Sequence, residues 1–194
     1  MKVIFLDVDG VLNSNHYFNK VHKKRIKGKR ISSHDIDERF VKNLKWLVDK
    51  TGAKIVLSSS WKILVKRDNN HYLHKILAKY GLTIFDYTPC TGIEKGADIQ
   101  EWLNRNSFCY DVTNIVILDD EDDMRHLKDY LIQTSFMPVY TDRKERVHHL
   151  PLLWRFLEGL TKSKCRQALK ILDKIYDRTY EKQEWVRKNS RKHF

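Results

Sequence analysis

The sequence predicts an α/β fold in which helices cover a mostly parallel, doubly wound sheet. Short apolar runs, each ending in polar residues, recur at residues 2–6, 54–57 and 114–118, as in buried parallel strands. Segments with apolar residues at helical spacing lie between them, and this alternation is typical of a parallel sheet with right-handed crossovers. A chain of 194 residues that is 41% hydrophobic is long enough for one full core.

The first strand and the first helix occupy the first fifty residues. The run at residues 2–6 (KVIFL) ends in acidic residues, as expected of a strand whose carboxyl end opens onto a site. Farther along, an apolar stripe predicts a helix, and Asp35 with Glu38 is expected to cap its N-terminus. The stripe comprises Phe40, Val41, Leu44, Leu47 and Val48.

The middle of the chain alternates strands with helices. The strand predicted at 54–57 (KIVL) is followed by a helical stripe at 72–80. A short helix is expected around 99–103, and the strand at 114–118 (NIVIL) leads to a fourth helix around 124–131. All three predicted strands therefore end in polar residues at one edge of the predicted sheet.

The pattern predicts only helices after about residue 142. One helix is expected to begin at Pro151, and a second stripe, which reaches Tyr180, predicts a long final helix that docks on the core. We therefore expect an α/β domain over residues 1–160, with a basic insertion near 14–34, and a basic helical extension over 161–194 that packs on it.

The net charge of +12 is concentrated in two segments. Residues 162–194 hold eleven Lys and Arg against four acids, and residues 19–30 hold seven and no acid. Such patches are typical of surfaces that bind a polyanion, nucleic acid first, although a basic surface that only aids solubility explains either segment alone. The candidates for nucleic-acid binding in the first segment are Lys20, Lys23, Lys24, Arg25, Lys27, Lys29 and Arg30.

Cysteine usage and hydropathy indicate the compartment. Three widely spaced cysteines without a CxxC pair argue against a disulfide framework and a structural zinc site. The chain has no run of 18 apolar residues, so we expect no membrane span. These observations predict a soluble, cytoplasmic protein.

The first group of candidate site residues directly follows the first strand. Asp7 and Asp9, two residues apart at a strand end, can reach a shared site, and Gly10 beside them lets backbone N–H groups approach a phosphate. A DxD pair also occurs in surface loops and in metal-dependent glycosyltransferases. The apolar strand before it and the Gly-Val-Leu-Asn after it favour a catalytic interpretation.

Further candidates are two serines that follow the second strand and a lysine that precedes the third helix. The hydroxyl of Ser58, at a strand end, can hold a phosphoryl oxygen without adding charge. Ser59 is a weaker phosphate-binding candidate, because it and Ser60 are also explained as a turn that caps the next helix. Lys95 precedes a helix, where its charge and the helix dipole suit an anionic transition state, whereas an isolated lysine is ordinarily a surface residue.

An acidic run follows the third strand, from Asp119 through Asp120 and Glu121 to Asp123. Adjacent carboxylates repel one another unless a cation neutralises them, and hard oxygen ligands suit Mg²⁺. An acidic helix N-terminus explains Asp122 and Asp123. It leaves Asp119 and Asp120, at the strand end, without an explanation.

In this order and context, the four groups resemble the motifs of the haloacid dehalogenase (HAD) superfamily of phosphohydrolases. The segments IFLDVDGVLN, TGAKIVLSSSW, IQEWL, VILDD and GLT resemble more specifically the HAD domain of Swiss Army Knife RNA repair proteins, over roughly residues 1–172. The resemblance implies a Rossmann-like HAD fold. The chain offers no insertion large enough for a cap domain, so we expect a minimal cap and a helical C-terminal extension.

The resemblance also assigns roles. It implies Asp7 as nucleophile, Asp9 as general acid/base, Ser58 as phosphate ligand, Lys95 as charge stabiliser and Asp119 as Mg²⁺ ligand. Asp7 and Asp9 are further metal-ligand candidates. The second supporting acid stays open, because adjacency favours Asp120 and the spacing DxxxD favours Asp123.

These residues predict a Mg²⁺-dependent phosphatase that forms an aspartyl phosphate. An open site beside basic appendages favours a nucleotide or the phosphorylated end of RNA or DNA as substrate. The alternative is a HAD-like module that binds nucleic acid or protein without catalysis. A purely structural interpretation does not require Asp7, Asp9, Ser58, Lys95 and Asp119 together.

Overall fold

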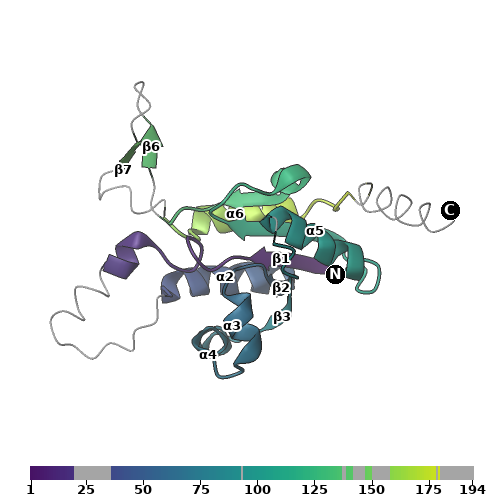
Figure 1. The fold of residues 1–194 in the computed structure, drawn as a ribbon, viewed down its shortest axis with the longest axis horizontal. Coiled ribbons are helices and arrows are strands. Elements are labelled where there is room, and N and C mark those ends of the chain that lie inside the picture. Colours follow the sequence, from purple (N-terminus) through teal and green to yellow (C-terminus); the bar gives the residue numbers. More distant parts are fainter. Residues whose placement is uncertain are drawn as a thin grey trace.

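The computed structural model describes residues 1–19, 36–92, 94–136, 139–141, 147–149, 158–177 and 179. Its centre is a five-stranded sheet in the order β3-β2-β1-β4-β5, with parallel pairing throughout (Figure 1). The strands are β1 (Lys2–Leu6), β2 (Lys54–Leu57), β3 (Ile84–Tyr87), β4 (Asn114–Asp119) and β5 (Leu131–Gln133). The predicted α/β class with a doubly wound parallel sheet is therefore confirmed.

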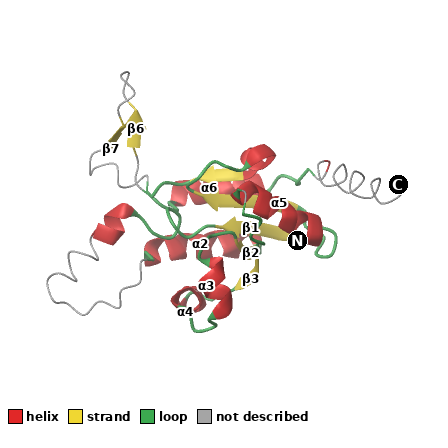
Figure 2. Cartoon of the chain, viewed as in Figure 1, coloured by secondary structure: helices red, strands yellow, loops and turns green. Residues whose placement is uncertain are grey.

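Helices cover both faces of the sheet (Figure 2). Alternate residues of β1 point to opposite faces: Ile4 and Leu6 belong to one apolar cluster, Val3 and Phe5 to the other. The first cluster contains side chains of α2 (Glu38–Thr51), α3 (Lys62–Arg67), α4 (Tyr72–Lys79) and α6 (Lys162–Leu172). The second contains those of α5 (Lys95–Asn106) and the 3₁₀ helix η1 (Arg125–Tyr130). Among the described residues, no helix has both the length and the apolar character needed to cross a membrane.

The N-terminal cap of α2 differs from the prediction. Asp37, not Asp35, is the cap, and its side chain accepts a hydrogen bond from the backbone N–H of Arg39 at 2.9 Å. Glu38 is consequently the first helical residue and cannot complete the cap three residues along. Asp35 lies outside the described residues.

The prediction of an α-helix around residues 124–131 is also wrong. Residues 125–130 form the 3₁₀ helix η1, and Leu131 begins β5 by pairing with Ile117 of β4. Leu127 is buried in the 3₁₀ helix, as it was expected to be in an α-helix, so the apolar spacing did not distinguish the two conformations. The short edge strands β3 and β5, of four and three residues, were not predicted, because their apolar residues form no clear alternation.

The C-terminal third departs from the wholly helical expectation. β6 (Val139–Thr141) and β7 (Val147–His149) form an antiparallel pair. Helix α6 ends at Leu172, yet Tyr176 is still buried, 5.2 Å from the ring of Tyr130, so the predicted stripe does not lie on one continuous helix. The helix expected at Pro151, residue Tyr180 and the basic segment 20–30 lie outside the described residues, and the division at residue 160 stays a prediction.

The order of the strands determines where a ligand site can form. After β1 the chain adds β2 and β3 on one side, and then returns to add β4 and β5 on the other. The connections that leave β1 and β4 therefore diverge, which opens a crevice at the carboxyl ends of these two strands.

Candidate active site

The sheet register brings the predicted residues to one edge. Leu6 pairs with both Leu57 and Leu118, so the residues that follow the three strands lie at the same level. The N–H of Asp7 donates to the carbonyl of Leu118 at 2.9 Å, and the N–H of Ser58 donates to that of Leu6 at 2.9 Å. Asp7, Ser58 and Asp119 thus meet at the carboxyl edge of the sheet.

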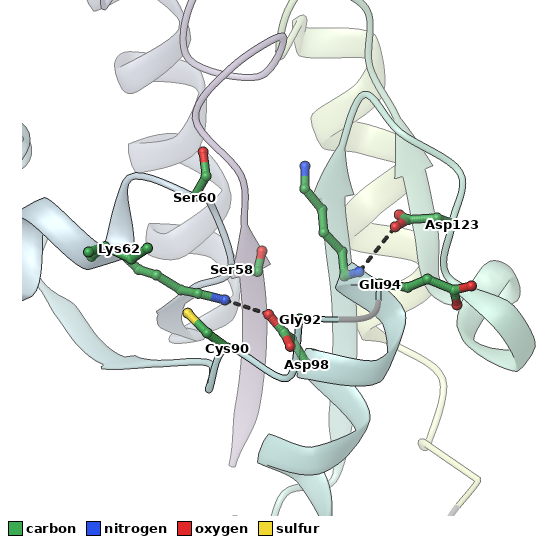
Figure 3. Close-up of a pocket in the computed structure, with 10 residues that line it drawn as sticks. Ser58, Ser60, Lys62, Cys90, Gly92, Glu94, Asp98 and Asp123 are labelled. Atoms are coloured by element: carbon green, nitrogen blue, oxygen red, sulfur yellow. Dashed lines mark hydrogen bonds and ion pairs between the residues drawn. The ribbon is translucent and has the colours of Figure 1, made fainter.

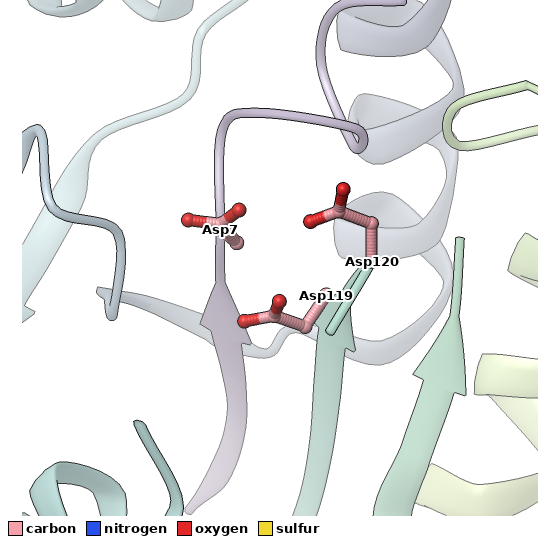
Figure 4. A group of neighbouring side chains, drawn as sticks. All are labelled: Asp7, Asp119 and Asp120. Atoms are coloured by element: carbon pink, nitrogen blue, oxygen red, sulfur yellow. The ribbon is translucent and has the colours of Figure 1, made fainter. Parts of the chain in front are cut away.

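Three carboxylates form a compact cluster at this edge (Figure 4). Asp7, Asp119 and Asp120 each offer an oxygen, and these oxygens all lie within 4.8 Å of one another. Asp7 is 2% exposed and Asp119 is fully buried. Within the described part of the chain, Oδ2 of Asp119 is buried without a hydrogen-bond partner. A set of hard oxygen atoms from two buried residues and one half-buried residue, with one unpaired member, fits a divalent cation such as Mg²⁺.

Lys95, the first residue of α5, is the cation of this cluster. Its Nζ donates to Oδ1 of Asp119 at 2.9 Å and lies 3.4 Å from Oδ2 of Asp7 and 3.3 Å from Oε2 of Glu121. Burial opposes the charged form of Lys95, but the charges of Asp7 and Asp119 outweigh this effect and raise its pKa. The ammonium therefore stays charged.

The charge of Lys95 does not cancel the effect of burial on the pKa values of these acids. Burial raises the pKa of Asp119 to about 7, with a further contribution from the Asp7 charge, and the same two causes raise the pKa of Asp120 to about 6. Burial also raises the pKa of Asp7. These carboxyl groups therefore bind protons more tightly than usual, chiefly because burial disfavours their charged form.

The position of the Asp120 side chain requires a glycine at residue 10. Gly10 has a φ of +68°, and a Cβ atom there would lie 2.4 Å from Cγ of Asp120. Only glycine adopts this conformation without strain and leaves room for the Asp120 carboxylate. The N–H of Gly10 donates to Oδ1 of Asn13 at 2.8 Å, so this predicted phosphate donor already has a partner within its own loop.

Asp9 lies apart from the acidic cluster. Its Oδ1 accepts from Nδ2 of Asn13 at 2.7 Å, and its Oδ2 accepts from the indole Nε1 of Trp61 at 2.9 Å. The group of possible metal ligands does not include it. Both carboxylate oxygens of Asp9 are therefore held by neutral donors.

Asp123 occupies a different position from Asp120. Its Oδ2 accepts from the backbone N–H of Lys95, the first residue of α5, at 3.0 Å, and its Oδ1 is buried without a partner in the described chain. A Cβ on Gly96 would lie 2.8 Å from the carbonyl oxygen of Asp123, which shows how closely this loop packs on the helix. The geometry groups Asp120, not Asp123, with Asp7 and Asp119.

The two serines after β2 face the cluster differently. The Ser58 hydroxyl is buried and has no hydrogen-bond partner among the described residues. The Ser59 hydroxyl accepts from the N–H of Trp61 at 3.4 Å, and its hydrogen bond to Asp7 opposes the effect of burial on the pKa of that carboxyl group. Ser58 thus offers the free hydroxyl, and Ser59 supports Asp7 and the turn.

An open pocket of about 310 Å³ adjoins this edge (Figure 3). Lys62 extends across one side of it to Asp98, while Asp123 lies on the other side. Ser58 and Lys95 line the pocket, which therefore gives access to the candidate phosphate ligands.

Three residues near the site were not predicted to act there. Trp61 and Asn13 were only parts of the quoted motif segments, yet both donate to Asp9. Lys164 of α6 is half-buried, and burial lowers its pKa to about 8, although the charge of Asp120 opposes this shift. No local pattern indicates these contacts, because the partners of Trp61 and Lys164 are distant in the sequence.

Comparison with known families agrees with this arrangement. The model of the HAD domain in Swiss Army Knife RNA repair proteins matches residues 3–143. Comparisons with curated proteins and with solved structures gave no significant match. The match covers most of the chain, including the three strands and every carboxylate of the cluster, and α6 lies beyond it. The chain therefore belongs to the family of HAD domains found in Swiss Army Knife RNA repair proteins.

Proposed function

We propose that this protein is a Mg²⁺-dependent phosphatase that forms an aspartyl phosphate on Asp7. Membership of the HAD family implies a HAD-type phosphohydrolase or a related module. One observation carries the proposal further: Asp7, Asp119 and Asp120 converge on one point, Lys95 faces two of them, and Asp119 has a buried carboxylate oxygen without a partner in the described chain.

The proposed metal site consists of Asp7, Asp119 and Asp120. Their oxygen atoms are the ligands that Mg²⁺ prefers. When bound, Mg²⁺ supplies positive charge that reduces the repulsion between the Asp7 carboxylate and an anionic phosphate monoester. Proton binding by the same carboxyl groups would compete with the metal, as their raised pKa values indicate.

The reaction proceeds in two steps at the two aspartates. An oxygen of Asp7 attacks phosphorus, the ester P–O bond breaks, and Asp9 gives its proton to the leaving oxygen. Water then attacks the phosphorus of the aspartyl phosphate, and Asp9 accepts a proton from it. Inorganic phosphate leaves and the Asp7 carboxylate is restored.

Lys95 and Ser58 complete the proposed phosphate site. The ammonium of Lys95 stabilises negative charge on the phosphoryl oxygens, and the unpaired hydroxyl of Ser58 donates to one of them. Both residues line the open pocket.

We propose a nucleotide or a nucleic-acid end as the substrate. The positive charge of the chain lies mainly in residues 19–30 and 162–194, which suits a polyanionic partner, and the matched family is that of RNA repair proteins. Replacing Lys23, Lys24 and Arg25 with glutamine should flatten the slope of log K against log salt by about 0.7–0.9 for each phosphate that the segment no longer neutralises. An unchanged slope would assign this segment to solubility instead.

The test is phosphate release by the purified protein, with Mg²⁺ and with chelator. The panel contains nucleotides, 5′- and 3′-phosphorylated oligonucleotides, sugar phosphates and phosphopeptides. We expect Mg²⁺-dependent release with the highest kcat/KM on a nucleotide or an oligonucleotide. A preferred sugar phosphate or phosphopeptide would refute the substrate class alone, and no release from any compound would favour a binding module.

A further inference from the structure

Two neutral donors hold the carboxylate of Asp9 in the described structure. The indole N–H of Trp61 donates to Oδ2 at 2.9 Å, and the amide of Asn13 donates to Oδ1 at 2.7 Å. Asp7, two residues earlier, is held by Lys95 instead. The two aspartates of one motif therefore have different partners: Asp7 faces a cation in addition to its hydrogen bond with Ser59, whereas neutral N–H groups hold Asp9.

The Trp61 ring is itself fixed by its surroundings. It follows the β2 turn, where its backbone N–H donates to the Ser59 hydroxyl. The ring packs against the apolar cluster under α2 and α4, and it lies 6.0 Å from the His71 ring in an edge-to-face arrangement. A side chain packed in this way aims its N–H group in one direction.

Asn13 is fixed by the loop that it closes. Its Oδ1 accepts from the N–H of Gly10 at 2.8 Å. Because a backbone N–H can only donate, this contact assigns the oxygen to the Gly10 side and the NH₂ group to the Asp9 side. Asn13 is 3% exposed, so the orientation is shielded from exchange with water.

We infer that Trp61 and Asn13 are positioning residues that hold Asp9 for proton transfer, an inference that rests on the proposed function. A general acid has to present its proton along the line to the leaving oxygen, and small displacements are costly. Each donor occupies one side of the carboxylate and prevents the group from turning towards Lys95 and the acidic cluster. Asp9 is thereby reserved for the proton, while Asp7 serves the phosphoryl group.

The test compares two leaving groups in the variant Trp61→Phe, which keeps an aromatic ring and removes the N–H group. A nucleoside monophosphate has a poor alkoxide leaving group that needs a proton, whereas 4-nitrophenolate departs without one. We expect kcat/KM for the nucleotide to fall at least about tenfold more than that for 4-nitrophenyl phosphate, with KM little changed. A general loss of packing would slow both substrates alike.

Two further variants act as controls. Trp102→Phe removes the same kind of hydrogen bond, because the indole N–H of Trp102 donates to Oδ2 of Asp86 at 2.7 Å. Neither residue belongs to the acidic cluster, so this variant should leave the ratio of the two kcat/KM values unchanged. Asn13→Asp keeps an oxygen for the Gly10 N–H but replaces the donor to Asp9 with a carboxylate that repels it, and it should lower the ratio as Trp61→Phe does. Thermal melts check that each variant is folded.

The outcomes separate this inference from the proposed function. If the wild type and Asp7→Asn release phosphate equally, the proposed function fails. The other case is that the wild type releases phosphate and Asp7→Asn does not. If Trp61→Phe and Asn13→Asp then lower kcat/KM equally for both substrates, or for neither, the positioning role is refuted while the phosphatase assignment stands.

Discussion

Two buried lysine–aspartate pairs lie at the same edge of this sheet, and their surroundings differ. In one, Nζ of Lys62 lies 2.6 Å from Oδ2 of Asp98. In the other, Nζ of Lys95 lies 2.9 Å from Oδ1 of Asp119. The partners of each pair, rather than the pair itself, distinguish a structural contact from a candidate site.

The Lys62 pair is balanced. The ammonium has three acceptors, Asp98, the Thr88 hydroxyl and the Pro89 carbonyl, which match its three hydrogen atoms. Burial would raise the pKa of Asp98, but the hydrogen bonds from Lys62 and Thr91 hold it below the ordinary value. This pair joins α3 to α5, and no charge is left over for a ligand.

The Lys95 pair is not balanced. Besides Asp119, the ammonium faces Asp7 and Glu121, and Oδ2 of Asp119 has no partner in the described chain. Burial raises the pKa values of Asp7, Asp119 and Asp120. A surplus of buried negative charge is costly unless a cation joins it, so this pair is the one that indicates binding.

The largest expected effect is on catalysis. Asp7→Asn keeps the shape of the side chain but removes the nucleophile, so phosphate release should fall by about three orders of magnitude or more. Asp173→Asn, at an exposed contact with Lys2, is the matched surface control and should keep wild-type turnover. Retention by Asp7→Asn of more than about a tenth of the activity would exclude Asp7 as nucleophile.

The second effect is on stability. Asp98→Asn leaves the buried Lys62 ammonium without its counter-charge and should lower the free energy of unfolding by about 3 kcal/mol. Urea unfolding with a common slope measures the difference. A loss as small as that of Asp173→Asn would show that the Lys62 pair is not a structural contact.

The third effect is a pH dependence of stability without metal. The pKa of Asp119 is raised in the fold to about 7 from an ordinary value of 3.8. The folded state thus binds this proton more tightly than the unfolded state, and the stability that it confers is present at low pH and is lost as pH rises from about 4 to 7. In chelator, Asp119→Asn should show a smaller fall in melting temperature over this range.

Mg²⁺ should restore the stability that the protein loses as the pH rises. A ligand that binds only the folded state raises its stability by mass action, so Mg²⁺ should raise the melting temperature of the wild type at pH 7 to 8 more than that of Asp119→Asn. An equal rise in both proteins would place the metal away from Asp119.

The smallest expected effect is that of Glu121→Gln. The Glu121 side chain is 60% exposed although it lies 3.3 Å from Lys95, and exposed ion pairs contribute about 0–1 kcal/mol. Unfolding and Mg²⁺ titration should both remain close to wild type. A large change in the Mg²⁺ titration would mean that the exposed acid, and not only the buried ones, takes part in metal binding.

The sequence by itself determined the strands that matter and the residues that follow them. β1, β2 and β4 were predicted with bounds that differ by at most one residue, because a buried parallel strand needs a continuous apolar run. The meeting of Asp7, Ser58 and Asp119 followed as well, since parallel strands end at the same edge. These are local patterns combined with one general rule of topology.

Only the tertiary structure decided which neighbours these residues have. It groups Asp120 with Asp7 and Asp119 and places Asp123 at the backbone N–H of Lys95, where α5 begins, a choice that spacing left open. It also brings Trp61 to Asp9 across 52 positions of the sequence. The register of the sheet and the packing of helices on its faces set such contacts, and no local periodicity records them.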